Sequence, residues 1–580
     1  MLKRQLALLV VVVLLPVLSF AQESESDQKE KARKRAALVE QILIDIPNLK
    51  LAENRAVAYA RIGSIAWNLD QKRAHSLYQN AVNELVNAQM LAESNRKPNA
   101  NQNELLTGGS TRPQVLNAIA AHEAEFALES LAKTRPAAIA KAMSLQPQAD
   151  KISNNTGNNN YLAQNERNME QSFLRIAADQ NPERAEKLIK DALAKGLSNE
   201  TLGLLRKLAE RNAGEAADLT TQVVDKLLHA EMTVNGQPNY QSNQMMVSIL
   251  NDYMSNQQSA GSSLKFDDSQ MRSMAQRLIG YYLERGNRDG NWLTYSITPI
   301  AEKFEPGVVE RLKSIAKNSS CGGRGLCSEN GYDPDVQKLL SSGDTSSEQL
   351  IAAAKKAPVN QRWQLYTTAA NKLAEQGNVA AARELLSDNF SDESLEQVMQ
   401  GLDNQYSYHL MNQGRFEEAE RLIDSLPESS RFSSLINLAN YAYQRDPEKN
   451  KTYAISIIRK ARDLVGEPPE SSNEFQNLIQ VVAILTNIEI SQAFQIYESL
   501  VPQMNELSDA AAVINGFQNN SQVRSGEFVL SQGNSFGFYA DYSPLRNLLG
   551  NDFDRTMKLI DSLSRREIRI SLKLQLAEGF

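Results

Sequence analysis

The sequence contains few of the residue types from which most metal and enzyme sites are built. Only 2 cysteines, 4 histidines and 3 tryptophans occur among 580 residues. His122-Glu123 could open a His-Glu-x-x-His zinc helix, but Phe126 occupies the place of the second histidine. Neither a Gly-x-x-x-x-Gly-Lys phosphate loop nor the ligand spacing of an EF-hand is present. We therefore expect no metal site, no bound cofactor and no catalytic residue that the sequence identifies.

A Gly-x-Ser-x-Gly motif does occur at residues 533–537. In the α/β-hydrolase mechanism the serine needs a histidine downstream of it to accept its proton. All four histidines precede this serine, the last at position 409, and no alternation of strands and helices surrounds the motif. The motif therefore does not indicate a nucleophile. A pair of distant carboxylates acting as general acid and base stays open as an alternative, because sequence cannot show which carboxylates meet.

Long apolar runs are missing after Ala21, and no basic face is indicated. The formal net charge is −7, whereas a nucleic-acid partner would require a basic surface to neutralise phosphates. The one basic run, residues 29–35, is interpreted as the solvated face of a helix, with contact to an anionic membrane as the alternative. We expect no nucleic-acid partner and no membrane-spanning segment in the mature chain.

Residues 1–21 have the pattern of a secretory signal peptide. Lys3 and Arg4 precede an apolar run from Leu6 to Leu18, and Ser19 and Ala21 are small residues at the −3 and −1 positions of a cleavage site. The run is shorter than the roughly 20 residues that span a bilayer, although an uncleaved anchor is the alternative. The pattern predicts an exported protein of the periplasm or the extracellular medium.

The two cysteines, Cys321 and Cys327, enclose three glycines in Cys-Gly-Gly-Arg-Gly-Leu-Cys. In an exported protein this spacing favours a local disulfide, and the glycines let the backbone turn tightly enough to form it. A redox pair would more typically show the Cys-x-x-Cys spacing, and a structural zinc ion needs four ligands. We predict a structural disulfide between Cys321 and Cys327.

A repeated pattern dominates the rest of the chain: an alanine followed by large apolar residues three and four positions later. The last four of these alanines recur with a period in the thirties, which is typical of one helical hairpin per repeat. The small residue lets two helices approach closely, and the large pair fills the groove behind it. The pattern occurs at Ala74, Ala185, Ala382, Ala419, Ala454 and Ala493.

Individual hairpins can be predicted from this pattern. An apolar stripe at Tyr59, Ile62, Ala66 and Leu69 is followed by Asp70 as turn and N-cap residue, and then by a second stripe from Ala74 to Leu85. The same order recurs at 173–193, where Pro182 suits the first turn of the second helix, and at 204–228. Polar stretches at 94–113, 146–168 and 234–270 are expected to be loops, the last with a helix at 245–254. Trp67 and Trp363 fall on helical stripes and are expected in the core.

Residues 412–423, Asn-Gln-Gly-Arg-Phe-Glu-Glu-Ala-Glu-Arg-Leu-Ile, resemble the inter-helix turn and second helix of a tetratricopeptide repeat. One repeat earlier, Gly377 and Ala382 have the same spacing, and Ala370 matches the small residue of the first helix. The clear resemblance covers residues 362–427, although the opening aromatic position holds Tyr366 and then Asp403. It implies a right-handed superhelix of stacked hairpins that binds proteins or peptides, and it implies no catalytic residue.

The sequence thus predicts an all-α, right-handed α-solenoid with an irregular insert near the C-terminus. The insert is rich in glycine and aromatics and is interpreted as a cap over the last helices or as an exposed partner contact. Its aromatic residues are Phe528, Phe536, Phe538, Tyr539 and Tyr542. The predicted segments are a signal peptide at 1–21, irregular repeats at 22–317, a disulfide linker at 318–347, a repeat array at 348–525, and the insert with capping helices at 526–580.

We expect a non-catalytic scaffold or adaptor of the bacterial envelope that presents a helical surface to a protein or peptide. The alternative is an α-helical envelope enzyme that acts on a glycan or peptide through a carboxylate pair. The two differ in structure: an enzyme should gather ionisable groups with shifted pKa values in one deep cleft. A scaffold should instead show a broad, shallow groove lined with Asn, Gln, Arg and Tyr. The sequence does not indicate an oligomeric state.

Overall fold

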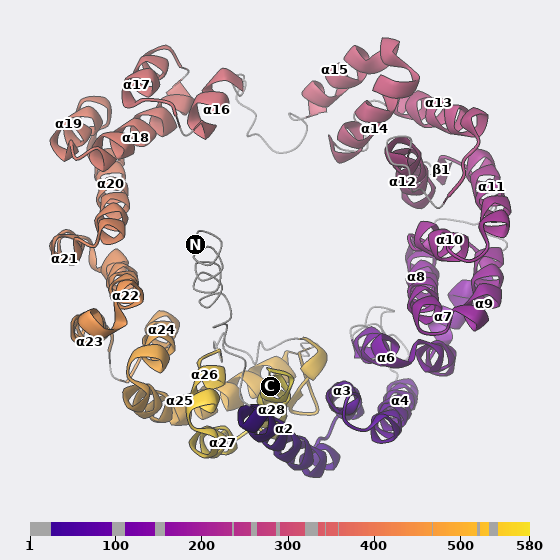
Figure 1. Cartoon of the computed structure of the whole chain (residues 1–580), viewed down its shortest axis with the longest axis horizontal. Helices are drawn as coiled ribbons and strands as arrows, with labels where there is room; N and C mark the ends of the chain where they lie inside the picture. The colour runs from indigo at the N-terminus through magenta and orange to yellow at the C-terminus, as the bar shows by residue number, and fades with distance from the viewer. Residues whose placement is uncertain are drawn as a thin grey trace, which may run out of the picture. The chain divides into compact units, whose positions relative to one another are not determined.

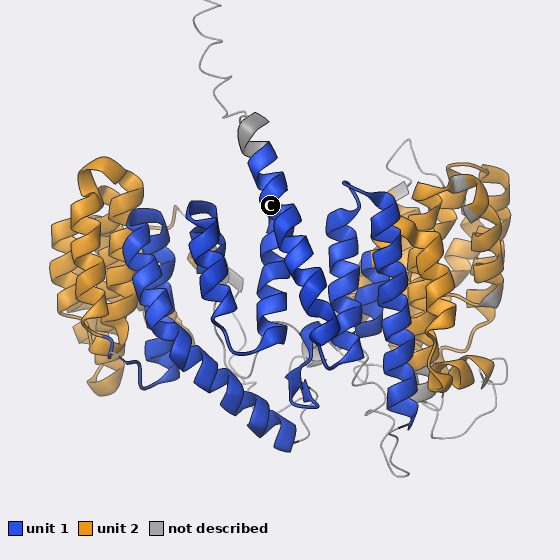
Figure 2. Ribbon diagram, turned by 90° about the horizontal axis from the view of Figure 1, so that it is seen from below, with its two compact units in different colours: residues 1–118, 465–580 blue, residues 119–464 orange. Residues whose placement is uncertain are grey.

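The computed structural model describes most of the chain and divides it into two compact units. Residues 1–118 together with 465–580 form unit 1, and residues 119–464 form unit 2, so the division falls inside helix α6 (Figure 2). The described residues are 25–94, 111–145, 157–234, 237–256, 264–285, 291–319, 334–342, 344–357, 359–466, 468–518, 522–532 and 543–579.

Helices make up nearly all of the described structure in both units (Figure 1). The elements of unit 1 are α2 (Glu25–Asp45), η1 (Ile46–Asn48), α3 (Ala52–Ala66), α4 (Gln71–Ser94), α24 (Ser472–Ile488), α25 (Ile490–Phe517), β3 (Val523–Arg524), β4 (Glu527–Phe528), η5 (Leu530–Gln532), α26 (Pro544–Asn551), α27 (Phe553–Asp561) and α28 (Arg566–Gly579). The antiparallel strands β3 and β4 form a short hairpin in which Val523 faces Phe528 and Arg524 faces Glu527.

Unit 2 contains a longer series of helices, which begins within α6 at Ile119. Its elements are α6 (Thr111–Lys133), α7 (Ala137–Leu145), α8 (Gly157–Gln180), α9 (Pro182–Lys195), α10 (Thr201–Ala209), α11 (Ala213–His229), β1 (Thr233–Val234), β2 (Gln237–Pro238), α12 (Tyr240–Asn256), α13 (Asp268–Arg285), α14 (Asn291–Phe304), η4 (Pro306–Val308), α15 (Val309–Ser319), α16 (Pro334–Ser341), α17 (Ser347–Lys356), α18 (Val359–Glu375), α19 (Val379–Asn389), α20 (Asp392–Gln413), α21 (Phe416–Asp424), α22 (Glu428–Arg445) and α23 (Pro447–Arg462).

The helices pair into antiparallel hairpins that stack on one another, which confirms the predicted all-α solenoid. In unit 2, α18 packs on α19, α20 on α21 and α22 on α23, and the first helices also pack on each other, α18 on α20 and α20 on α22. Figure 1 shows α18, α20 and α22 in one layer and α19, α21 and α23 in the other. Each hairpin buries its apolar stripes against its neighbours, so no single repeat has a core of its own.

The alanine pattern lies where the sequence places it, on the buried side of second helices. Ala74 on α4 and Ala493 on α25 are fully buried, as are the three alanines of the array. The three are Ala382, Ala419 and Ala454. The side chain of Ala185 lies outside the described residues. Replacing such an alanine with a larger residue would separate two helices that touch at this point.

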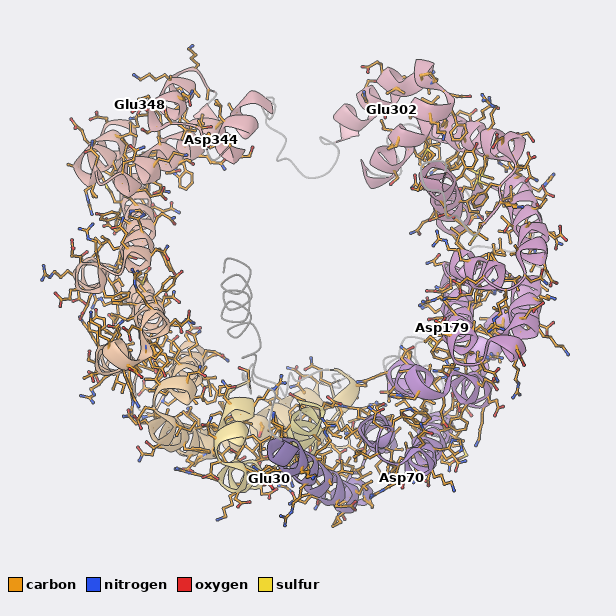
Figure 3. All side chains as sticks on the ribbon, viewed as in Figure 1. Glu30, Asp70, Asp179, Glu302, Asp344 and Glu348 are labelled. Carbon is orange, nitrogen blue, oxygen red and sulfur yellow. The ribbon has the colours of Figure 1, made fainter. Side chains whose placement is uncertain are left out.

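The predicted turn residues are also confirmed. Asp70 lies between α3 and α4 (Figure 3), and its Oδ1 accepts a hydrogen bond of 3.0 Å from the Arg73 N–H. This bond satisfies one of the N–H groups that a helix start leaves unpaired. Pro182 begins α9, and its missing N–H costs nothing at that position. In α4 all six residues predicted to be buried are buried: Ala74, Leu77, Tyr78, Ala81, Val82 and Leu85.

Three expectations are wrong. Leu69 is 62% exposed because α3 ends at Ala66, before the apolar stripe is complete. Trp363 is 46% exposed on α18 instead of buried in the core. Residues 157–168 form the start of α8, since tertiary packing gives a helix to a polar segment whose composition favours a loop.

Four arginines occupy the same position in four first helices, and the sequence pattern did not predict this. Each is the fourth residue of its helix, and its guanidinium donates to a carbonyl five or six residues earlier in the chain. Arg362 Nε lies 2.9 Å from the Ala357 oxygen, and Arg431 Nη2 lies 3.0 Å from the Leu426 oxygen. The others are Arg55, bonded to the oxygens of Leu49 and Lys50, and Arg569, bonded to those of Leu563 and Ser564. Each arginine thereby satisfies backbone oxygens at the entry to a hairpin.

Unit 1 is assembled from segments that lie far apart in the sequence. Helix α28 packs against both α2 and α3, and residues 54 and 527 are in direct contact. The predicted boundary at 318–347 differs from this division. Half of that linker, with Cys321 and Cys327, lies outside the described residues, as does the signal peptide. Those assignments stay predictions. Among the helices described, none is long and apolar enough to cross a membrane.

Candidate functional site

The surface that best matches a binding role lies on the first-helix layer of α20 and α22. Asn437 Nδ2 donates to the Tyr408 hydroxyl over 2.7 Å, and the Tyr408 and Tyr441 rings meet edge to face with centroids 6.5 Å apart. Tyr441 is 37% exposed. We name Tyr408, Asn437 and Tyr441 the tyrosine surface. Its rings are held by neighbours, so little side-chain entropy is lost when a partner covers them.

The helix periodicity explains why these residues are presented. On α22, buried Leu435, Leu438, Ala439 and Ala442 form the core stripe, so Asn437 and Tyr441 fall outside it. Further along α22, Gln444 Nε2 donates to Asn440 Oδ1 over 3.1 Å. The side of α22 outside its core stripe is therefore lined with amides and a tyrosine.

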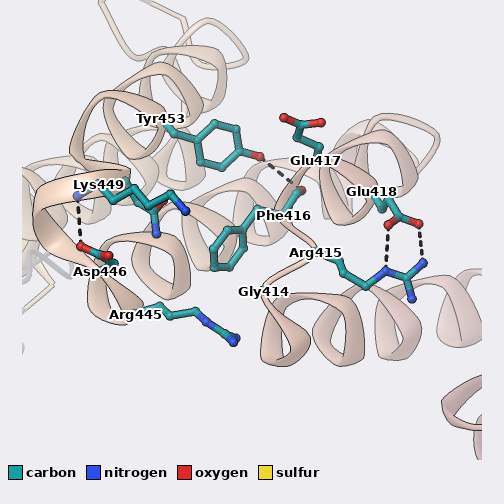
Figure 4. Close-up of a pocket in the computed structure, with 10 residues that line it drawn as sticks. Gly414, Arg415, Phe416, Glu417, Glu418, Arg445, Asp446, Lys449 and Tyr453 are labelled. Carbon is teal, nitrogen blue, oxygen red and sulfur yellow. Dashed lines mark hydrogen bonds and ion pairs between the residues drawn. The ribbon is translucent and has the colours of Figure 1, made fainter.

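A cavity of about 610 Å³ lies where the α20–α21 turn meets the α22–α23 turn (Figure 4). Phe416 and Tyr453 contribute two tilted rings with centroids 6.3 Å apart. Its other lining residues are Gly414, Arg415, Glu417, Glu418, Arg445, Asp446, Lys449 and Asn450. The cavity lies in the segment that resembles a tetratricopeptide repeat, at the junction of two successive hairpins.

Gly414 is required by the geometry of this junction. It ends α20 in the left-handed region with φ of 78°, and Arg445 Nη1 donates to the Asn412 oxygen over 2.8 Å across it. A Cβ at position 414 would lie 2.8 Å from Arg445 Cζ. Glycine therefore both permits the turn and leaves room for the guanidinium.

Most charges in the cavity already have partners. Arg415 forms a bidentate pair with Glu418, at 2.8 and 2.5 Å, which lowers the pKa of Glu418 and raises the pKa of Arg415. The Tyr453 hydroxyl donates to Glu420 Oε2 over 2.9 Å. Burial, and then this hydrogen bond, raises the pKa of Tyr453, so the phenol stays protonated and serves as a donor and not as a base.

A smaller cavity of about 280 Å³ occupies a related place between the α8–α9 and α10–α11 hairpins. Asp179 lines it and pairs with Lys207 Nζ over 2.9 Å. Both of these cavities therefore lie at a junction between two successive hairpins of unit 2. Their polar and mutually paired linings fit contact with another polar surface better than proton transfer.

The described residues do contain two buried carboxylates that approach each other, Glu527 and Glu567 in unit 1. Burial and the charge of Glu567 raise the pKa of Glu527, while hydrogen bonds from Lys50 and Asn54 act in the opposite direction. Their oxygens are occupied: Glu527 accepts from the backbone of residue 50 over 2.7 Å, and Glu567 accepts from Arg565 over 2.8 Å. Neither lines the two cavities above, so this pair acts as a structural contact between segments.

The aromatic insert is only partly described. Phe528 is 1% exposed in β4, so its ring packs inward, as the cap interpretation expects, and the Arg565 guanidinium lies 5.1 Å from the ring centroid. It is not available as a surface contact. Phe536, Phe538, Tyr539 and Tyr542 lie outside the described residues, as do residues 533–537 of the Gly-x-Ser-x-Gly motif.

Three of the described histidines contact residues of their own helices, and His75, which lies 2.9 Å from Gln79 Nε2, is one of them. His409 stacks on Tyr406 and lies 2.6 Å from Gln413 Nε2, and His229 Nδ1 lies 2.7 Å from the Asp225 oxygen. Within the described ranges, no three His, Cys, Asp or Glu side chains gather in an arrangement that could hold a metal ion.

Comparisons with known proteins give a low-scoring likeness to two solved structures. No protein-family model and no curated protein matches the chain. Among solved structures, the chain is similar to a "Circular tandem repeat protein with novel repeat topology and enhanced subunit contact surfaces" at 14% identity, over 94% of this chain and 99% of that one, with a TM-score of 0.20. It is also similar to the Naa15/Naa10 complex bound to HypK-THB, at 10% identity over 92% and 96% of the two chains, with the same TM-score. The stacked hairpins define the protein as a helical-repeat protein of the α-solenoid class.

Proposed function

We propose that this protein is an exported, non-catalytic helical-repeat scaffold that binds a protein or peptide partner on the tyrosine surface. The observation that carries the proposal is the pair of linked tyrosines, Tyr408 and Tyr441, on the exposed side of adjacent first helices. Tyrosine gives a large contact area with a polar end, and such residues dominate binding energy at protein interfaces. The surrounding amides of α22 can pair with the backbone of an extended peptide.

Export rests on the sequence pattern of residues 1–21, and the paired spacing of Cys321 and Cys327 agrees with an oxidising compartment. The compartment is the periplasm or the extracellular medium. N-terminal sequencing of the protein recovered from envelope fractions would test this part separately. We expect the mature chain to begin at Gln22, whereas an intact Met1 in the membrane fraction would contradict export by cleavage.

Binding is tested with residues 22–580 used to capture partners from envelope extract, followed by mass spectrometry. A partner that binds on the tyrosine surface should be retained by the unmodified chain and lost by Tyr408→Ala/Tyr441→Ala. The matched control is Glu384→Ala/Arg421→Ala, which changes exposed residues of the second helices α19 and α21. Equal retention by both variants would exclude the tyrosine surface. Turnover of envelope glycan or peptide by the unmodified chain would favour the enzyme alternative instead.

A further inference from the structure

Helix α28 occupies the position of a first helix in unit 1, next to α3 and parallel to it. Arg566 Nη1, at the start of α28, donates over 2.8 Å to the Asn48 oxygen just before α3. Near the other end, Arg61 of α3 forms a bidentate pair with Glu578, at 2.6 and 2.7 Å. Parallel neighbours of this kind are the first helices of successive hairpins, as α20 and α22 are in unit 2.

The arginine register supports the same assignment. Arg569 is the fourth residue of α28 and bonds the carbonyls of residues 563 and 564, as Arg55, Arg362 and Arg431 bond carbonyls before their own first helices. In the chain, α28 directly follows two further helix pairs, α24 with α25 and α26 with α27. The first helices α24 and α26 pack on each other, and α26 packs on α28. Helix α28 is therefore the next first helix of this series.

The helix that packs on α28 as its second helix comes from the opposite end of the sequence. Helix α2 ends at Asp45, and the oxygen of Asn48, three residues later, binds Arg566 at the start of α28, so the end of α2 lies at the start of α28. Lys573, in the middle of α28, lies 3.7 Å from the Asp45 carboxylate. The two helices are therefore antiparallel. Ile42 of α2 and Leu574 of α28 are fully buried in one cluster with Ile62 of α3.

We propose that α28 and α2 form one repeat hairpin, which we call the terminal hairpin. This hairpin holds the N-terminal and C-terminal segments of unit 1 together. The repeat series then runs through α24–α25, α26–α27, α28–α2 and α3–α4 without interruption. Helices α2 and α3 reach their native packing only when the C-terminal segment is present. This inference concerns assembly and does not depend on the proposed binding function.

A buried polar contact secures the same junction. Helix α3 has Leu51 at its N-cap position and no side-chain cap of its own. Glu527, from the other end of the chain, binds the backbone just before this helix: it accepts from the N–H groups of Lys50 and Leu51, at 2.7 and 3.3 Å, and from Asn54 Nδ2 at 2.6 Å. A carboxylate is favourable at this end of a helix because the helix dipole is positive there.

Asn54 extends this contact to the backbone of β4 and of η5. Its Nδ2 donates to the Phe528 oxygen over 2.7 Å, and its Oδ1 accepts from the Leu530 N–H over 2.8 Å. Asn54 is fully buried and Glu527 is 4% exposed. We call Asn54, Glu527 and the backbone groups that they bind the clasp. Breaking the clasp would leave several buried donors and acceptors unpaired. We therefore expect α3 and residues 527–530 to separate cooperatively, with all of these hydrogen bonds lost together.

The test is hydrogen exchange with mass spectrometry on residues 22–580, comparing Leu574→Ala with Leu435→Ala. Both leucines are fully buried, the first on α28 in unit 1 and the second on α22 in unit 2. Leu574→Ala should accelerate exchange in α2, α3 and 522–532 together, by about tenfold or more, and leave residues 119–464 unchanged. Unchanged exchange in α2 and α3 would overturn the proposal, as would equal acceleration of α2 and α3 by the control.

A permuted chain gives an independent test if Leu574→Ala fails to fold. Residues 25–47 are moved to follow residue 580 through a short Gly-Ser linker, so that the new chain starts at Asn48 and keeps the backbone groups that Glu527 and Arg566 bind. The terminal hairpin then becomes continuous, and α2 should show the same slow exchange as in the unmodified chain. Loss of protection in α2 while residues 119–464 remain protected would contradict the assignment of α2 as the second helix of α28.

Discussion

The two units of this protein use the same hairpins but different ranges of contact along the chain. In unit 2 each helix packs mainly on its neighbours in sequence, and the polar link between hairpins, Tyr408 to Asn437, joins residues about one repeat apart. In unit 1 the clasp joins Asn54 to Glu527. The comparison shows that a repeat array needs only local contacts to propagate, whereas joining segments from opposite ends requires specific buried polar contacts.

The largest expected effect comes from breaking the clasp. Asn54→Ala removes three buried hydrogen bonds and should reduce the free energy of unfolding of unit 1 by roughly 2 to 4 kcal/mol. Asn437→Ala in unit 2 removes one partly buried bond and should cost about 0.5 to 1.5 kcal/mol. Chemical denaturation followed by circular dichroism measures both. Equal losses would contradict the contrast between the units.

A second effect concerns how hairpins join within unit 2. Gly414 and Gly377 both have positive φ, of 78° and 86°, but only Gly414 lies under an arginine. Alanine at either position should cost about 1 to 2 kcal/mol for the left-handed backbone. Gly414→Ala should cost more because Arg445 must move. The difference in melting temperature between Gly414→Ala and Gly377→Ala measures the cost of displacing Arg445. Equal melting temperatures would mean that the guanidinium moves aside without cost.

The pH dependence of unit 1 provides a third prediction. Burial raises the pKa of Glu527, so the folded state binds this proton more tightly than the unfolded chain does. The stabilising contribution is complete below the ordinary glutamate pKa of about 4.3 and is lost as pH rises through the raised pKa. The unmodified chain should therefore gain stability relative to Glu527→Gln as pH falls from 7 toward 5. Urea unfolding of both proteins at several pH values checks this, and a constant difference would contradict it.

The smallest effect is expected from an exposed ion pair in unit 1. Arg555 binds both oxygens of Glu498, at 2.8 and 2.9 Å, but both side chains are more than a third exposed. Arg555→Gln should cost no more than about 1 kcal/mol, and less at high salt. Thermal unfolding at two salt concentrations measures it. A loss as large as that of Asn54→Ala would show that exposed pairs, and not the clasp, hold unit 1 together.

Much of the fold could be predicted because the repeat pattern is local. The alanine spacing, the Asp70 cap and Pro182 act within one hairpin. A stretch of sequence about one repeat long is therefore enough to predict that hairpin. Exposure of Trp363 could not be predicted, since helical spacing alone does not show which side of a first helix a neighbour covers. The same holds for the helical start of α8, whose polar residues are packed by partners outside the window.

The candidate site could be predicted only in part. The Gly414-Arg415-Phe416 segment was identified by its resemblance to a tetratricopeptide turn, but the opposite side of the cavity, with Arg445 and Tyr453, comes from the next hairpin. The clasp gave no signal, because a single Asn and a single Glu near opposite ends of the chain form no pattern. Composition alone does not show whether Phe528 is a surface or a cap residue, and its burial beside Arg565 excludes a surface position for this one residue.

The most direct test of this account is hydrogen exchange of the unmodified chain, residues 22–580, over increasing urea. We predict that α2, α3, α28 and residues 522–532 lose protection at one urea concentration, as a single cooperative group, and that residues 119–464 open separately. Loss of protection in α2 and α3 at a lower urea concentration than in α28 would contradict the account, because the two ends would then not form one unit.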